Sequence, residues 1–183
     1  MSDLSVQYQQ FTDYYHQYKH KVFSYLFYRS GQNLALAEDL ASDVFLKAYE
    51  RFENYNNDYA FSTWIFTIAR NHLIDYFRKK REVMVAEIEI SDERNSEDKL
   101  KKEMDVETAM EKIRPLIAEL PPLQQDCIVM KYLGEMENKE IAEITGESEE
   151  KVRQNISRAI KKLKAKSSFF NFMLLVTLYI KLR

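Results

Sequence analysis

The sequence has few of the residues that make turns, disulfides and metal sites. Its 183 residues include three glycines, three prolines and one cysteine. Folds rich in β-sheet need more turn residues than this, so the sequence predicts an all-α protein. The single cysteine, Cys127, excludes an internal disulfide and a cysteine-cluster metal site. It lies in an apolar helical run, so we expect its thiol to be buried.

Histidines are also scarce, and nothing points to catalysis. His16 and His20 are four residues apart, a spacing that suits a metal pair on a helix, but no further ligand cluster accompanies them. The sequence contains no phosphate-binding loop, nucleophile elbow or dinucleotide-binding glycine pattern. We therefore expect no metal, no cofactor and no enzymatic activity.

Long apolar runs and a leader segment are missing as well. The first residues show no cationic stretch followed by an apolar one, so no signal peptide is visible and a cytoplasmic location is predicted. The most apolar stretch, residues 169–180, is shorter than the about 20 residues that cross a membrane. The tail at 167–183 leaves three alternatives open: an extra helix packed on the protein, an interface for a partner protein, or a weak contact with a membrane surface.

Strong net charge is absent too, but the charges are segregated along the chain. The net charge of −2 argues weakly against a nucleic-acid partner. Residues 62–81 and residues 147–166 each carry a net +4, whereas residues 82–112 carry −6. Two basic segments that flank an acidic one indicate two anion-binding modules and a linker that avoids the anion.

Residues 62–81 form the clearest helical pattern in the chain. They contain no glycine or proline, and their apolar residues recur at spacings of three and four. Ser62 or Thr63 is expected to cap the start, and the basic run at 78–81 is expected at the C-terminal end, where it suits the helix dipole. The predicted apolar face consists of Trp64, Ile65, Ile68, Ala69, Leu73 and Phe77.

Two helices and a loop are predicted before this segment. Aromatic residues dominate 5–29, Gly31 is expected to end that helix in the left-handed conformation, and an amphipathic helix follows at 34–52. The loop at 53–61 interleaves aromatic rings with Asn and Asp. This mixture is unusual for a plain connection and suits the capture of an unstacked base.

The C-terminal part reads as a helix-turn-helix. The periodicity fails from 82 to about 106, and Pro121 and Pro122 then start a helix. Asn138 is expected to cap a short helix that ends at Gly146, and a long basic helix follows to about residue 166. A short helix, a tight turn and a basic helix are typical of DNA readers. The face predicted to be exposed on the long helix consists of Lys151, Arg153, Gln154, Asn155, Ser157, Arg158 and Lys161.

Four segments in this order resemble the extracytoplasmic-function (ECF) group of the sigma-70 family, the small two-domain bacterial RNA polymerase sigma factors. They are A-E-D-L-A-S-D-V-F-L-K-A-Y (37–49), residues 61–81, L-P-P-L-Q-Q-D-C-I-V-M-K-Y-L-G (120–134) and residues 138–163. The resemblance implies two small helical domains joined by a flexible acidic linker. The expected boundaries are a region 2-like domain at 5–82, the linker at 83–106, a region 4-like domain at 107–166 and the hydrophobic tail at 167–183.

The resemblance also implies partners and site residues. The partners are core RNA polymerase and promoter DNA, with an anti-sigma factor as a further candidate. The residues implied to bind polymerase are Asp39, Leu40, Asp43, Val44 and Lys47. Those implied for the promoter minus-10 element are Tyr55, Tyr59, Trp64, Arg70, Asn71, Arg78, Lys79, Lys80 and Arg81. Those implied for the minus-35 element are Lys151, Arg153, Gln154, Ser157, Arg158 and Lys161.

A second function stays open on the residues alone. A helix-turn-helix transcriptional regulator that is not a polymerase subunit would use the same C-terminal helices. It predicts a dimer and a ligand pocket, and it leaves the loop and helix at 53–81 without a role.

Overall fold

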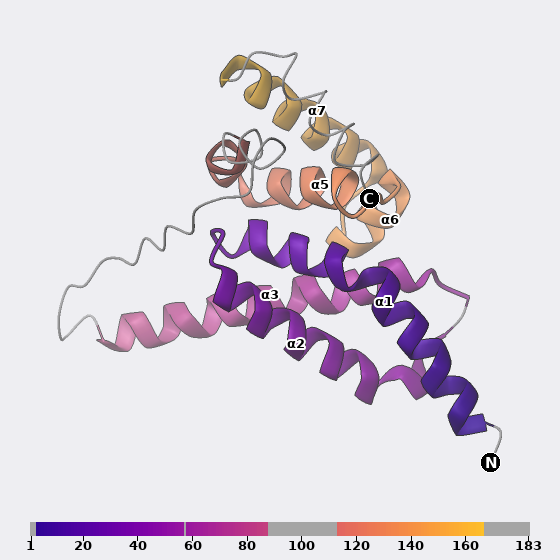
Figure 1. Ribbon diagram of the computed structural model, residues 1–183. Coiled ribbons are helices and arrows are strands. Elements are labelled where there is room, and N and C mark those ends of the chain that lie inside the picture. The colour runs from indigo at the N-terminus through magenta and orange to yellow at the C-terminus, as the bar shows by residue number, and fades with distance from the viewer. Residues whose placement is uncertain (1–2, 57, 88–112, 167–183) are drawn as a thin grey trace, which may run out of the picture.

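The computed structural model describes residues 3–56, 58–87 and 113–166, and every regular element in these ranges is helical. The all-α prediction is therefore confirmed for the described residues. Most of the predicted linker and the whole tail at 167–183 lie outside them. In Figure 1 the described helices form two groups that lie against each other, a first half up to residue 87 and a second half from residue 113.

The first half consists of three long helices and one short turn. Helix α1 spans Asp3–Arg29, α2 spans Leu34–Glu50, the 3-10 helix η1 spans Phe52–Asn54, and α3 spans Phe61–Glu87. The chain reverses between α1 and α2 at Gly31, which has a φ of +77° as predicted for a left-handed cap. Asn33 then caps α2, because its side chain accepts the backbone N–H of Leu36.

The second half is built from shorter helices. A helical segment at 113–118 precedes α5 (Pro122–Tyr132), α6 (Asn138–Thr145) and α7 (Glu149–Lys166). Proline at the first position of α5 and left-handed Gly146 after α6, with a φ of +71°, confirm two predicted boundaries. Figure 1 shows α5 and α6 against the first half and α7 on their outer side.

Two predicted helix caps are wrong. Helix α3 begins one residue earlier than expected, and the Ser62 hydroxyl donates to Glu140 instead of accepting a backbone N–H. Helix α6 is capped by Glu137, whose side chain and that of Glu140 form a reciprocal capping box, so Asn138 is the first helical residue. The pattern Glu-x-x-Glu places a carboxylate at the positive end of α6, which stabilises its start.

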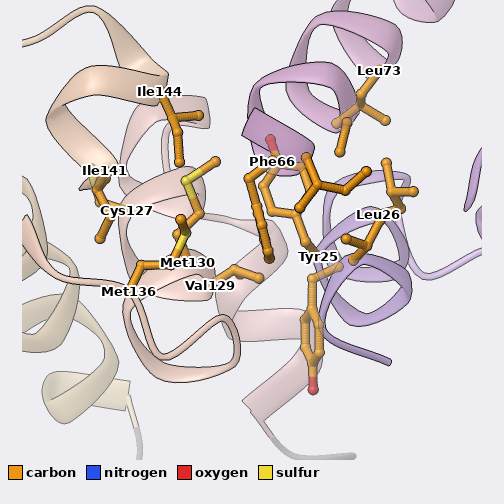
Figure 2. Close-up of a cluster of buried hydrophobic side chains, with 14 of the residues drawn as sticks. Tyr25, Leu26, Phe66, Leu73, Cys127, Val129, Met130, Met136, Ile141 and Ile144 are labelled. Carbon is orange, nitrogen blue, oxygen red and sulfur yellow. The ribbon is translucent and has the colours of Figure 1, made fainter. Parts of the chain in front are cut away.

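One apolar cluster joins the two halves. Figure 2 shows Tyr25, Leu26, Phe66 and Leu73 of the first half beside residues of α5, α6 and the turn between them. The labelled side chains from the second half are Cys127, Val129, Met130, Met136, Ile141 and Ile144. The sequence predicts two small helical domains joined by a linker, and it does not indicate this shared core.

The shared core explains an error in the predicted face of α3. Phe66 was left off that face, but it is fully buried and packs against the Tyr25 ring at 5.6 Å between centroids. Phe77 was placed on the face, but it is 38% exposed. Periodicity within α3 does not show which of its residues other helices cover, and Phe66 is covered by Tyr25 of α1.

Gly134, at the end of α5, is expected to tolerate no side chain. A Cβ at this position would lie 2.6 Å from the Met130 carbonyl oxygen and 3.2 Å from the Met130 Cα. Both are backbone atoms that cannot rotate away, so Gly134→Ala should lower the free energy of unfolding by about 1–3 kcal/mol, measured by urea denaturation. Leu36→Met, at a half-buried position of α2, is the control and should cost under about 1.5 kcal/mol. An unchanged stability of Gly134→Ala would contradict this packing.

Candidate functional site

Helices α6 and α7 form the helix-turn-helix that the sequence predicts. The turn between them is closed by the backbone N–H groups of Gly146 and Glu147, which both donate to the Ala142 carbonyl. Ser148 starts α7 by accepting the backbone N–H of Lys151 at 3.2 Å. Ile141 and Val152 are fully buried between the helices and fix how α7 lies on α6.

The outer face of α7 carries the predicted DNA-reading residues. All six side chains assigned to the minus-35 element are exposed, namely Lys151, Arg153, Gln154, Ser157, Arg158 and Lys161. Two of them already have partners within α7 or just before it. Lys151 forms an ion pair with Glu147 at 2.7 Å, and the Gln154 amide donates to Glu150 at 3.3 Å.

Asn155 is predicted on this face from the sequence, and that prediction is wrong. It is 7% exposed, and its side-chain N–H donates to the Lys151 carbonyl at 2.8 Å. Polar residues inside a helix can satisfy themselves on the backbone one turn earlier, which lets them turn toward the core. Asn155 therefore belongs to the packed side of α7 with Ile156.

Helix α3 presents a second basic surface. The side chains of Asn71, Arg78, Lys79, Lys80 and Arg81 are exposed, and Arg78 is paired with Asp75 at 3.0 Å. The helix continues to Glu87, and its last turn holds no basic residue. The predicted stabilisation of the run by the helix end is therefore wrong. The cations lie along the flank of a continuous helix.

The aromatic residues just before α3 and in its first turn are packed together to different degrees. Trp64 is half-buried, with its ring 5.0 Å from that of Tyr55 and 5.4 Å from that of Phe61. The Tyr55 hydroxyl donates to the Tyr59 carbonyl at 2.5 Å. Tyr59 itself is 62% exposed. Of the three rings assigned to the minus-10 element, Tyr59 is the one that solvent reaches most freely.

The five residues assigned to polymerase binding all lie on α2, but they differ in solvent exposure. Asp39 and Asp43 are exposed and Lys47 is partly exposed. Leu40 and Val44 lie in the core, with 3% and 0% of their surface accessible, so in this structure they are not exposed for a direct contact. They lie on the apolar stripe that holds α2 against its neighbours, and they support the exposed residues from beneath.

Arg70 is held by a buried carboxylate from the second half. Asp126 of α5 is 3% exposed, and its two oxygens accept from Tyr25 at 2.9 Å, Arg29 at 2.6 Å and Arg70 at 3.3 Å. Gln125 accepts a further N–H of Arg29 at 2.7 Å. The two guanidinium groups and the phenol thus satisfy a charge that would otherwise be costly to bury.

This cluster changes the proton affinities of its members. Burial raises the pKa of the Tyr25 phenol well above its ordinary value, and the Asp126 carboxylate raises it further. For Arg29, burial is the largest single influence and opposes the charge, but the attraction of Asp126 and Tyr25 and their hydrogen bonds together outweigh it, and the pKa is raised. Tyr25 therefore stays a neutral donor and Arg29 stays a cation, which is the state that Asp126 needs.

Further polar contacts join the first half of the protein to the second half. Ser62 donates to Glu140, Lys21 pairs with Glu135, and Gln32 donates to the Arg114 carbonyl. No local pattern indicates these contacts, because each joins residues about 80 or more positions apart. Of the residues predicted to bind promoter DNA, Arg70 is the one drawn into the boundary between the two halves, through its hydrogen bond to Asp126.

Comparison with known proteins identifies the family. Residues 14–83 match the family model described as Sigma-70 region 2, and residues 110–163 match that described as Sigma-70, region 4. The ECF RNA polymerase sigma factor SigW of Bacillus subtilis is 31% identical over 143 residues, which cover 73% of this chain and 76% of SigW. This chain belongs to the ECF sigma factors of the sigma-70 family.

Two further relatives bear on the extent of this ECF sigma factor. YlaC of Bacillus subtilis, an RNA polymerase sigma factor, is 29% identical over 83% of this chain and 88% of its own length. BldN of Streptomyces coelicolor, an ECF RNA polymerase sigma factor, is 32% identical over 81% of this chain but only 57% of its own length. The chain therefore spans little more than half of BldN.

Solved structures share the fold of this ECF sigma factor. The sigma factor RpoE of Bartonella quintana, in complex with the anti-sigma factor NepR, superposes with a TM-score of 0.70 at 20% identity. The match covers 86% of this chain and 96% of RpoE. CnrH, in complex with the cytosolic domain of CnrY, superposes with a TM-score of 0.61, also at 20% identity, over 86% of each chain.

The described part of this sigma factor has neither a membrane-spanning helix nor a group of side chains suited to a metal ion. None of its described helices is long and apolar enough to span a membrane. Within residues 3–56, 58–87 and 113–166, no three or more His, Cys, Asp or Glu side chains are grouped so as to hold a metal ion.

Cys127, buried as predicted, should be unreactive in the folded sigma factor. Burial raises the pKa of its thiol to about 12, with Asp126 as a further cause. At pH 8 the thiolate fraction is then roughly 1000-fold below that of a free thiol, because each pKa unit is a factor of ten. We expect the disulfide reagent DTNB to label the native protein only as fast as it opens, and the urea-unfolded protein within seconds. Labelling of the native protein at the rate of free cysteine would contradict the buried placement.

Proposed function

We propose that this ECF sigma factor binds core RNA polymerase through the exposed face of α2 and directs it to promoters by reading two DNA elements. The residues before α3 and its basic flank engage the minus-10 element, and the outer face of α7 engages the minus-35 element. The protein acts by binding in the cytoplasm, and it catalyses no reaction itself.

The observation that carries this proposal is the division of α7 into two faces. Its apolar residues are buried against α5 and α6, while the cations and amides assigned to the minus-35 element are all exposed. Arg and Lys bind phosphates, and Arg and Gln can also donate to the edges of bases in the major groove. We assign Arg153, Gln154 and Ser157 to base edges, and Lys151, Arg158 and Lys161 to phosphates.

At the minus-10 element, Tyr59, Asn71 and the basic run at 78–81 are available as they stand, because all are exposed. The Nε–H of Arg70 donates to Asp126 at 3.3 Å, so we propose that promoter binding separates this pair and turns the whole guanidinium group toward the DNA backbone. Unstacking a base costs on the order of a few kcal/mol, and stacking it on an aromatic ring returns about 1–3 kcal/mol. This near balance implies that melting depends on the polymerase as well as on this chain.

The partners proposed are core RNA polymerase, promoter DNA and an anti-sigma factor. The solved structure of RpoE named above is a complex of a sigma factor with the anti-sigma factor NepR, which supports the last of these. A regulator independent of polymerase is less well supported, because residues 14–83 match sigma-70 region 2 and such a regulator would not need them. The tail at 167–183 lies outside the described residues, and its three alternatives stay predictions.

A binding titration tests the proposal. Fluorescently labelled sigma factor is titrated with core RNA polymerase, and the complex is then footprinted on genomic promoter fragments. We expect submicromolar binding to the core and protection of two separate DNA segments, of which the upstream one is lost in an Arg153→Ala variant. Binding of the sigma factor alone to a single palindromic site, with no affinity for the core, would instead support the independent regulator.

A further inference from the structure

A histidine of α3 lies between two charged residues of the proposed polymerase-binding face. Asp43 and Lys47 are one turn apart on α2, and the His72 ring is placed between their charged groups. Its Nε2 is 3.0 Å from an Asp43 carboxylate oxygen, and its Nδ1 is 2.6 Å from the Lys47 ammonium. The His72 side chain is only 14% exposed, whereas that of Asp43 is 59% exposed.

The chemistry of these contacts defines the state of the ring. An ammonium group can only donate, so Nδ1 must accept from Lys47 and carries no proton. A neutral ring then has its proton on Nε2, from which it donates to Asp43. Both nitrogens of His72 are therefore engaged, one by each charged neighbour, and the ring connects α3 to α2.

Without this ring, Asp43 and Lys47 would be expected to pair with each other. An acid followed by a base four residues later is a favourable ion pair on a helix. Elsewhere in the chain, Glu147 in the turn before α7 and Lys151 in its first turn have the same spacing and meet directly at 2.7 Å. In a direct ion pair each charge is largely neutralised by the other, so both attract the charges of a third group less strongly.

We propose that His72 is a positioning residue that keeps Asp43 and Lys47 apart, so that both charges remain available to the polymerase. This inference rests on the proposed function, because it requires that the exposed face of α2 docks on the core enzyme. The partner surface that fits is one with a cation opposite Asp43 and an anion opposite Lys47. His72 itself does not touch the polymerase, since its ring is covered by the two helices.

Substitutions of His72 test this role. His72→Leu fills similar space but cannot hydrogen-bond, so Asp43 and Lys47 collapse onto each other and affinity for core RNA polymerase falls by about tenfold. His72→Gln can accept from Lys47 and donate to Asp43, so it should bind within about twofold of the unchanged chain. His16→Leu, at an exposed position on α1, is the matched control and should leave the affinity unchanged. Urea denaturation of each variant separates loss of affinity from loss of folding.

A double-mutant cycle excludes a merely structural effect. In a chain that already carries Asp43→Ala and Lys47→Ala, His72→Leu should cause no further loss of core affinity, because there are no charges left to position. If His72→Leu costs tenfold in both backgrounds, or if Gln fails to rescue, the positioning role is wrong although the α2 face still docks. If Asp43→Ala and Lys47→Ala leave core affinity unchanged, the docking face itself is wrong and the inference fails with it.

Discussion

Replacing Asp126 with alanine is expected to destabilise the protein more than any other single change at the boundary between its halves. The substitution leaves Arg29 and Tyr25 without their main partner at a site that is 3% exposed. Breaking a buried ion pair by removing one member costs about 3–5 kcal/mol. We expect about 3 kcal/mol, because the Arg29 and Arg70 side chains keep 13% and 22% exposure and can regain some water.

Thermal and urea unfolding measure this loss directly. For a chain of this size about 3 kcal/mol corresponds to a fall in Tm of roughly 6–12 °C. Glu119→Ala, which removes an exposed ion pair with Lys166, is the control and should change the stability by less than about 1 kcal/mol. Hydrogen exchange should show faster exchange in α5 and in α3 around Phe66 in the Asp126 variant. An Asp126→Ala protein as stable as the Glu119→Ala protein would show that the two halves do not depend on this carboxylate.

Substitutions on α7 should have the largest effect on promoter recognition. Arg153→Ala is expected to lower the affinity of the polymerase complex for its promoter by about 5- to 150-fold, which corresponds to 1–3 kcal/mol for a lost base contact. It should also relax sequence preference at one position of the upstream element. Arg158→Ala should weaken binding to all sequences alike and reduce the slope of log affinity against log salt by about one.

The comparison between these two variants separates base reading from phosphate binding. Lys166→Ala serves as a control, since Lys166 is an exposed cation at the end of the same helix and is paired with Glu119. It should leave both the sequence preference and the salt slope nearly unchanged. If the three variants lose affinity equally and without any change in sequence preference, α7 contributes only general positive charge and does not read the minus-35 element.

Local patterns in the sequence predicted most of the helices and one of the two basic faces accurately. The spacing of Val152, Ile156 and Leu163 is enough to orient α7, because all three are buried on one side of an amphipathic helix. The prediction for Asn155 is wrong, since a polar side chain that donates to a backbone carbonyl one turn earlier, here that of Lys151, leaves no trace in a hydrophobic pattern. Leu40 and Val44 were assigned by resemblance to a binding surface, although their apolar spacing already indicated the core.

The long-range contacts could not be predicted in this way. Nothing near Asp126 in the sequence indicates that Tyr25, Arg29 and Arg70 surround it, because their positions depend on how separate helices pack. Phe66 and His72 show the same limitation within α3. Neither lies on the apolar face predicted for α3. Phe66 packs on Tyr25 of α1, and His72 contacts Lys47 of α2, and the sequence alone does not place these residues side by side.

Run-off transcription in vitro tests the central claim most directly. Core RNA polymerase is incubated with genomic promoter fragments, with and without this protein, and the lengths of the transcripts are measured. The account predicts discrete transcripts that appear only when the protein is present and that are lost in the Arg153→Ala variant. Transcripts of identical length and yield with and without the protein, on fragments that its complex with polymerase binds, would contradict a role in initiation.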